Sequence, residues 1–189
     1  MRKTFIVITT LVLFCVGCTS EDNNSNHNKS NTNNTDNTGT LKTLDIGIIG
    51  KMPKDSFENV TFHQTDPESL KKGEYDAYFV TDEYFQELSE DRWVAVFLEL
   101  HKPVFFLNAN LEPFIFRVKH MEYDDGYPKA TMNTEGFVKL KDKDSFKKWG
   151  YGEPSESTDI DDVPKWIFNE IFKDINDYLY SSTFATQNR

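Results

Sequence analysis

Five polar residues directly follow segments that the sequence predicts to be buried strands. They are Lys51 after one strand, Thr81, Asp82 and Glu83 after another, and Asn108 after a third. In open α/β sheets, ligands bind outside the carboxyl ends of the strands, where such residues meet. The pattern therefore predicts a small polar pocket in which an acidic pair lies beside a lysine. The alternative is structural: Thr81 or Asp82 caps a helix, and Glu83 complements the helix dipole.

The glycines near Lys51 do not form a phosphate-binding loop. Gly47 and Gly50 are separated by two residues, whereas a P-loop needs four residues between its glycines and a hydroxyl after the lysine. Met52 stands in place of that hydroxyl, and Pro53 lacks an amide hydrogen. The GxGxxG pattern of dinucleotide-binding folds is absent as well. We interpret the glycines as positions where the strand turns sharply, and we expect no cofactor.

One histidine lies near three carboxylates in a short run, formed by His120, Glu122, Asp124 and Asp125. Imidazole and carboxylate groups could together hold a divalent cation. Metal sites usually draw ligands from separate elements, however, and this run matches no established ligand spacing. We therefore interpret it as a solvated acidic turn and expect no metal. The GxSxG and HExxH motifs of common hydrolases are also missing.

The elements that would position the five polar residues alternate between strands and helices. Apolar runs predict four buried strands, at residues 44–50, 59–64, 75–81 and 104–107. Helical patterns occupy residues 67–72 and 81–101, the second with a break near 89–91. This alternation is typical of a parallel sheet with right-handed helical crossovers.

The second half of the folded region is less regular. Residues 114–119 and 136–140 predict two further strands, antiparallel and near an edge of the sheet, with a turn cluster between them. Residues 145–149 predict one helical turn. The expected fold class is therefore α/β: a single small domain with a mostly parallel sheet and an antiparallel edge.

The last segment predicts an amphipathic helix that runs to about Tyr180. Asp161 or Asp162 is expected to cap this helix, and Pro164 lies in its first turn. An apolar stripe along it should pack on one face of the sheet. The stripe consists of Val163, Ile167, Phe168, Ile171, Phe172, Ile175 and Leu179.

The start of the chain combines basic, apolar and cysteine residues. Two basic residues precede an uncharged, mostly apolar run over residues 4–16, which is too short to span a bilayer, and the tetrad CVGC occupies residues 15–18. This segment resembles a bacterial lipoprotein signal peptide with its lipobox, although Cys15 stands where that family usually has leucine. The resemblance implies cleavage before Cys18 and attachment of a diacylglyceryl group to its sulfur. The alternative is an ordinary secretory signal, which would release the protein.

The segment after the lipobox has no side chains that could form a core. Residues 19–40 include no aliphatic or aromatic residue, which predicts a disordered tether that spans about 25 Å on average. The expected organisation is thus a cleaved signal peptide over 1–17, a lipidated cysteine and tether over 18–40, and a globular domain over 41–189.

The charge of the domain limits its partners. The chain has a net charge of −10, and the basic signal and acidic tether cancel, so the domain carries the whole imbalance. An acidic body is repelled by nucleic acid and by anionic headgroups. We therefore expect no nucleic-acid partner and no domain lying flat on lipid.

These features predict a lipoprotein that is anchored in the cell membrane through Cys18 and faces the extracellular or periplasmic side. Two hypotheses for its function remain open. The preferred one is a non-enzymatic module that binds a small-molecule ligand or another envelope protein. The alternative is an envelope or extracellular enzyme that acts through acidic residues such as Asp82 and Glu83.

Overall fold

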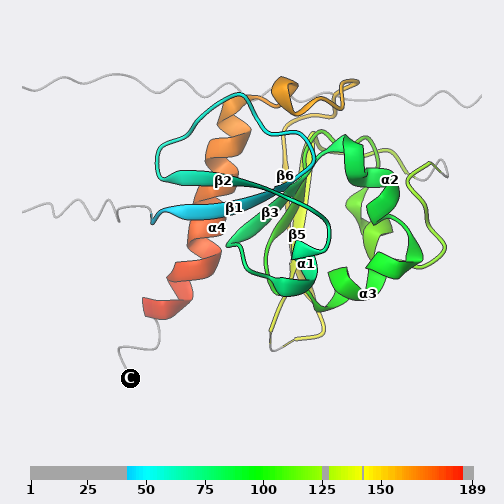
Figure 1. Ribbon diagram of the computed structural model, residues 1–189, viewed down its shortest axis with the longest axis horizontal. Helices are drawn as coiled ribbons and strands as arrows, with labels where there is room; N and C mark the ends of the chain where they lie inside the picture. The colour runs from blue at the N-terminus through cyan, green and yellow to red at the C-terminus, as the bar shows by residue number, and fades with distance from the viewer. Residues whose placement is uncertain (1–41, 125–127, 142, 185–189) are drawn as a thin grey trace, which may run out of the picture. The chain divides into compact units, whose positions relative to one another are not determined.

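A six-stranded mixed sheet organises the protein in the computed structural model, which describes residues 42–124, 128–141 and 143–184. The sheet has the order β2-β1-β3-β4-β5-β6 (Figure 1). Its strands are β1 (Leu44–Ile49), β2 (Val60–Thr65), β3 (Ala77–Val80), β4 (Val104–Phe106), β5 (Thr134–Lys139) and β6 (Phe146–Tyr151). Neighbours among β1 to β4 are parallel, whereas β5 and β6 are antiparallel. The predicted α/β class, with a mostly parallel sheet and an antiparallel edge in one small domain, is confirmed.

Short helices cover one face of this sheet. Helix α1 (Ser69–Lys72) connects β2 to β3, and the 3-10 turn η1 (Asp82–Tyr84) with helices α2 (Phe85–Leu88) and α3 (Asp91–Glu99) connects β3 to β4. The predicted break in the long helical segment is therefore present. Aromatic rings dominate the core here, and the rings of Phe106 and Phe116 stack at 4.0 Å.

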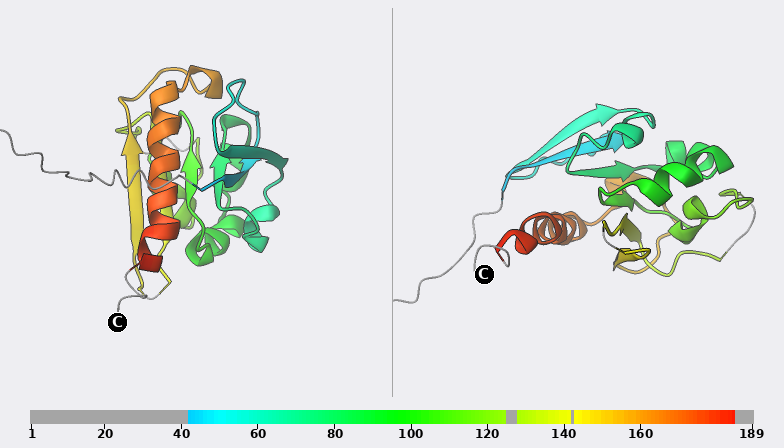
Figure 2. Two further views of the ribbon diagram at one scale, coloured as in Figure 1. Left: turned by 90° about the vertical axis from the view of Figure 1, so that its left-hand side faces the viewer. Right: turned by 90° about the horizontal axis from the view of Figure 1, so that it is seen from below.

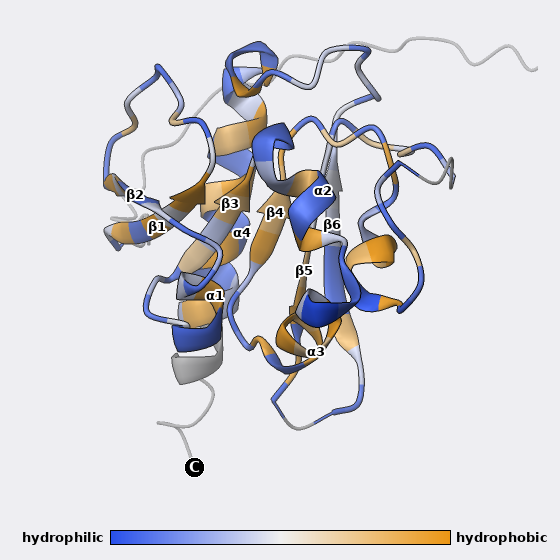
Figure 3. Cartoon of the chain, turned by 45° about the vertical axis from the view of Figure 1, so that its right-hand side comes forward, coloured by the Kyte–Doolittle hydropathy of each residue, from blue (hydrophilic) through white to orange (hydrophobic). Residues whose placement is uncertain are grey.

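The C-terminal helix α4 (Lys165–Phe184) covers the opposite face (Figure 2). Its predicted apolar stripe is buried from Ile167 to Ile175 and packs on buried apolar residues of the strands. Figure 3, coloured by hydropathy, shows hydrophobic stretches in both the strands and α4. Each fully buried side chain of this size contributes about 1.5–3 kcal/mol. Packing on the sheet therefore holds the helix in place, as expected.

The start of α4 differs from the prediction. Asp161 and Asp162 do not cap it but lie in a separate 3-10 turn, η3 (Ile160–Asp162), and α4 begins directly after Pro164. The reason is that Asp159 accepts a hydrogen bond from the Asp161 amide and so begins the turn before the helix.

The strand predicted at residues 114–119 is wrong. These residues overlap a 3-10 helix, η2 (Pro113–Arg117), which proline begins. Ile115 and Phe116 are both fully buried although they are neighbours in sequence. A strand would point them to opposite faces, whereas a helical turn lets both contact the same core.

The helical turn predicted at residues 145–149 is also wrong. This segment belongs to β6, which pairs with β5 at the edge of the sheet. Its aromatic side chains alternate between the faces: Phe146 packs on Phe137 and Trp149 packs on Phe105. Pairing with β5 decides its conformation, because such a short run has little helix stability by itself.

The connections after β1 and β3 leave the carboxyl edge of the sheet over opposite faces. The loop from β1 to β2 passes over the α4 face, where Phe57 lies 5.1 Å from Phe168. The connection from β3 to β4 passes over the other face. The chain thus diverges after β1 and β3, which is the point where α/β folds with this strand order bind ligands.

Within the described residues, no helix is both long and apolar enough to cross a bilayer.

Candidate functional site

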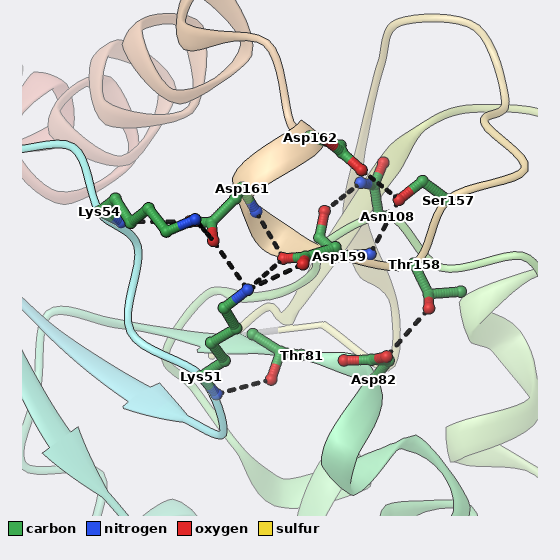
Figure 4. A network of polar contacts seen from close by, with 10 residues as sticks. All are labelled: Lys51, Lys54, Thr81, Asp82, Asn108, Ser157, Thr158, Asp159, Asp161 and Asp162. Atoms are coloured by element: carbon green, nitrogen blue, oxygen red, sulfur yellow. Dashed lines mark hydrogen bonds and ion pairs between the residues drawn. The ribbon is translucent and has the colours of Figure 1, made fainter.

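The candidate site lies at the carboxyl edge of the sheet, where β1 to β4 end, and Figure 4 shows its polar contacts. The backbone of Gly50 has a φ of 113° and turns the chain out of β1. The amide of Lys51 then donates a hydrogen bond to Thr81 Oγ1 at 2.9 Å, which joins the ends of β1 and β3. A side chain on Gly50 would overlap that same hydroxyl group. The close approach therefore requires glycine. The predicted sharp turn is present at Gly50 but not at Gly47, which lies inside β1, where the Tyr75 ring packs against its backbone.

The Lys51 ammonium group is held by two aspartates from the loop before α4. Its Nζ lies 2.6 Å and 2.8 Å from the two carboxylate oxygens of Asp159, and 2.7 Å from Asp161 Oδ2. Lys54 Nζ also lies 2.8 Å from Asp161 Oδ2. These contacts raise the pKa of Lys51, chiefly through the hydrogen bonds to Asp159 and then Asp161. Hydrogen bonds from Lys51 and Lys54 lower the pKa of Asp161 to about 2.

A buried polar cluster continues the site behind this ion pair. Asn108 Nδ2 donates to the main-chain oxygen of Asp159 at 2.6 Å, and Asn133 donates to the side-chain oxygen of Asn108. Thr134 Oγ1 donates to Asn133 Oδ1 at 3.0 Å. All three side chains are buried, so their mutual hydrogen bonds offset the cost of removing them from water. The cluster therefore fixes the loop at residues 157–162 to the ends of β4 and β5.

The two acidic residues predicted beside the lysine lie on this same edge, and Glu83 Oε2 would be 3.5 Å from a Cβ atom added to Gly50, the residue before Lys51. Asp82 accepts a hydrogen bond from Thr158 Oγ1 at 2.9 Å, and Glu83 is exposed at the start of η1. The described ion pairs join Lys51 to Asp159 and Asp161 and to neither of these residues. The structure thus brings Lys51, Thr81 and Asn108 into one network, with Asp82 attached to it through the same loop.

Sequence reasoning missed Asp159, Asp161 and Asn133. The run SESTDIDD before α4 offered only a helix-capping signal, and Asp159 is 108 positions from Lys51 in the sequence. Only the packing of the loop on the sheet edge brings them together.

The histidine and carboxylate run has internal partners. His120 Nδ1 lies 3.0 Å from Asp91 Oδ2, which belongs to another element, and Asp125 lies outside the described residues. Glu122 also has a partner. Across residues 42–124, 128–141 and 143–184, no group of three or more His, Cys, Asp or Glu side chains is arranged to hold a metal ion. Cys18 also lies outside these ranges.

The charged groups at the carboxyl edge of the sheet mainly bind one another. Lys51, Asp82, Asp159 and Asp161 each have a partner from the chain itself. A neighbouring depression of about 340 Å³ has mixed charge from Lys54, Asp55 and Asp161. Comparison with protein families, with curated proteins and with solved structures finds no match to this chain. The site must therefore be interpreted from its own geometry, which is that of a fastened loop.

A larger cavity lies at the opposite, amino edge of the sheet, where β1 to β4 begin. It has a volume of about 530 Å³, within the usual range for ligand pockets. Apolar side chains from α1 and α3 line it together with a group of basic residues, Lys71, Lys72, His101, Lys102 and Lys141. We name it the basic pocket. The sequence did not predict it, although lysines at the end of α1 and just before β4 were its signal.

Proposed function

We propose that this protein is a membrane-anchored surface lipoprotein whose folded domain binds a ligand or another envelope component without catalysing a reaction. One observation carries the second part of the proposal. The Lys51 amine at the carboxyl edge, beside the ends of β1 and β3, is bonded at 2.6–2.8 Å to two aspartates of the chain's own loop. An amine held in this way is poorly placed to act on a substrate, since its pKa is raised and its hydrogen bonds are used.

The anchor rests on the lipobox resemblance at residues 15–18. Two acyl chains hold a protein stably at a membrane, whereas a single chain gives only marginal binding. The domain would then be displayed at the surface on a polar tether, a position that suits a binding module.

Replacement of the acylated sulfur tests the anchor. The Cys18→Ser protein should lose its fatty-acid label and no longer be processed as a lipoprotein, as shown by metabolic labelling with palmitate and by its electrophoretic mobility. Cys15→Leu is the matched control, because it removes a thiol from the same segment but places at position 15 the leucine that the lipobox family usually has, so labelling should be unchanged. A Cys18→Ser protein that is still labelled would contradict the proposal.

A second experiment tests the binding role. Whole cells are crosslinked, and the full-length protein is recovered from their membranes and compared with a sample from uncrosslinked cells. We expect specific envelope components, whether protein or lipid, in the crosslinked sample alone. Recovery of no component above background would count against a binding function.

A further inference from the structure

The basic pocket concentrates positive charge in an acidic protein. Four lysines and one histidine line it, against a single carboxylate, Glu99. The chain as a whole has a net charge of −10. Its floor is apolar, since Leu70 and Leu100 are buried there. A cavity of this kind fits a ligand with an anionic group and an apolar body.

Most of these lysines have no partner within the described part of the chain. Lys71 pairs with Glu68 at 2.7 Å and lies over the Trp93 ring, but Lys72, Lys102 and Lys141 have no hydrogen bond or ion pair to any described residue. Like charges gathered at one cavity repel one another, and an anion in the cavity would remove that cost. The site therefore differs from Lys51, whose charge the protein itself neutralises.

The tether joins the domain at this same edge. Lys42, the first described residue, precedes β1, and its amide donates to Asn176 Oδ1 of α4 at 3.1 Å. Its ammonium group lies 4.0 Å from the centre of the Tyr180 ring. A second cavity of about 260 Å³ reaches this part of α4 at Tyr178 and shares its lysines and His101 with the basic pocket. Lys42, where the described chain begins, thus lies at the amino edge of the sheet.

We propose that the basic pocket binds the phosphate group of an anionic phospholipid in the membrane to which the protein is anchored. This inference rests on the proposed anchoring function and gives the domain a defined orientation on the bilayer. Lysine binds phosphate as a point charge, and the apolar floor would contact the glycerol and upper acyl atoms of the same lipid. The headgroup source is favoured over a free phosphate because the tether and the pocket share one edge.

The net charge of the domain does not prevent such binding. The Debye length is about 8 Å at physiological ionic strength, whereas a domain of this size has a radius of gyration of about 15 Å. Anionic headgroups at the amino edge therefore interact mainly with the local lysines and only weakly with the acidic remainder. The repulsion expected from net charge applies to the other surfaces of the domain.

Hydrogen exchange on the anchored protein tests this orientation. The full chain, purified with its own lipid, is reconstituted in vesicles of phosphatidylcholine and in vesicles of equal parts phosphatidylcholine and phosphatidylglycerol. We expect slower exchange of amides at residues 69–73 and 99–102 in the phosphatidylglycerol vesicles only, and loss of this difference in high salt. Each lysine near an anionic surface contributes about fivefold, so Lys72→Gln, Lys102→Gln and Lys141→Gln together should weaken the contact on the order of 100-fold.

A matched variant carries the same charge change away from the pocket, at Lys119, Lys129 and Lys173, and should keep the protection. Equal exchange in the two vesicle types, with the protein still floating with the vesicles, would overturn the lipid site and leave the anchor intact. Protein that fails to float would instead contradict the anchor. Protection in phosphatidylcholine vesicles on addition of glycerol phosphate would assign the pocket to a soluble anion and overturn the lipid assignment.

Discussion

Lysines lie at both edges of the parallel strands, but the two edges use them differently. At the carboxyl edge, Lys51 is bonded to Asp159 and Asp161, and a buried amide cluster behind it secures the same loop. At the amino edge, Lys72 and Lys102 line an open cavity and have no partner among the described residues. The first arrangement stabilises the protein, whereas the second leaves charge for an external partner. At the position where α/β folds usually bind ligands, this protein has an internal network of ion pairs and hydrogen bonds.

The largest difference between the edges should come from their turn glycines. Gly50 has a φ of 113° and lies against the Thr81 hydroxyl group, so Gly50→Ala combines backbone strain with overlap and should cost about 3 kcal/mol. Gly73 has a φ of 62° but its nearest side-chain neighbour, Lys102 Cγ, would be 3.8 Å away. Gly73→Ala should therefore cost only about 1 kcal/mol. Urea unfolding measures both, and equal losses would contradict the contrast in packing.

The buried amide cluster at the carboxyl edge should show the next largest effect. Asn108→Ala leaves the Asp159 carbonyl and the Asn133 amide without their partner, which should cost about 2 kcal/mol more than Asn59→Ala. Asn59 is the matched control because it also has a positive φ but is exposed. Thermal unfolding of the two variants gives the difference, and values that agree would show that the cluster contributes nothing.

A smaller effect concerns Glu135, a residue of β5 near the carboxyl edge. Unlike Asp161, Glu135 has no ion pair with a lysine among the described residues. Its Oε1 atom is buried and has no hydrogen-bond partner within the described residues. Burial, followed by the charge of Glu112, raises its pKa from 4.5 to about 7. The folded state therefore binds more protons than the unfolded state between these values, and stability falls as pH rises through that window.

Glu135→Gln should consequently stabilise the protein by about 1 kcal/mol above pH 7, after allowance for the partial exposure of the group. Near pH 4.5 the gain should vanish, because the folded wild-type carboxyl group is then protonated. Denaturant unfolding across this pH range measures the effect. A gain that is equal at both ends of the range would show that ionisation is not its cause.

The smallest effect should come from the lysines themselves. The pKa of Asp161 is lowered to about 2 in the folded state, so the stabilisation by Lys51 is complete above about 3.8 and is lost as pH falls through about 2. Lys51→Met should therefore lower the urea midpoint near neutral pH and match the wild type near pH 2. The effect is modest because both partners are partly exposed.

Lys102→Met removes the same charge at the amino edge and is the control for Lys51→Met. No described partner loses a contact in this variant, so its urea midpoint should not show the acid-dependent difference. If the two substitutions give the same profile between neutral pH and pH 2, the contrast between paired and unpaired lysines is wrong.

Much of the fold could be predicted from local patterns. The apolar runs of β1, β3 and β4 and the stripe of α4 were recognised because their periodicity requires one or two buried faces. Residues 114–119 and 145–149 were misassigned, since segments this short carry too little periodicity to separate a strand from a helical turn. Pro113 in η2 and the pairing of β6 with β5 decided between these conformations.

The site was predictable only in part. Lys51, Thr81 and Asn108 were expected together because the ends of parallel strands meet at one edge. Asp159 and Asp161 were not, because a loop without regular structure can reach many places on the surface. The basic pocket was missed for a related reason: its lysines come from α1, the start of β4 and the end of β5, which are separate in sequence.

The amino-acid sequence by itself determined the order and type of most elements and the α/β class, and it is the only source of the lipoprotein prediction. These features depend on the spacing of residues that are only a few positions apart, and that spacing can be read directly from the sequence. The tertiary structure alone decided that Lys51 is neutralised by a distant loop while Lys72 and Lys102 are left at an open cavity. Charges separated by many residues become partners only when packing brings their elements together, and no local pattern encodes that distance.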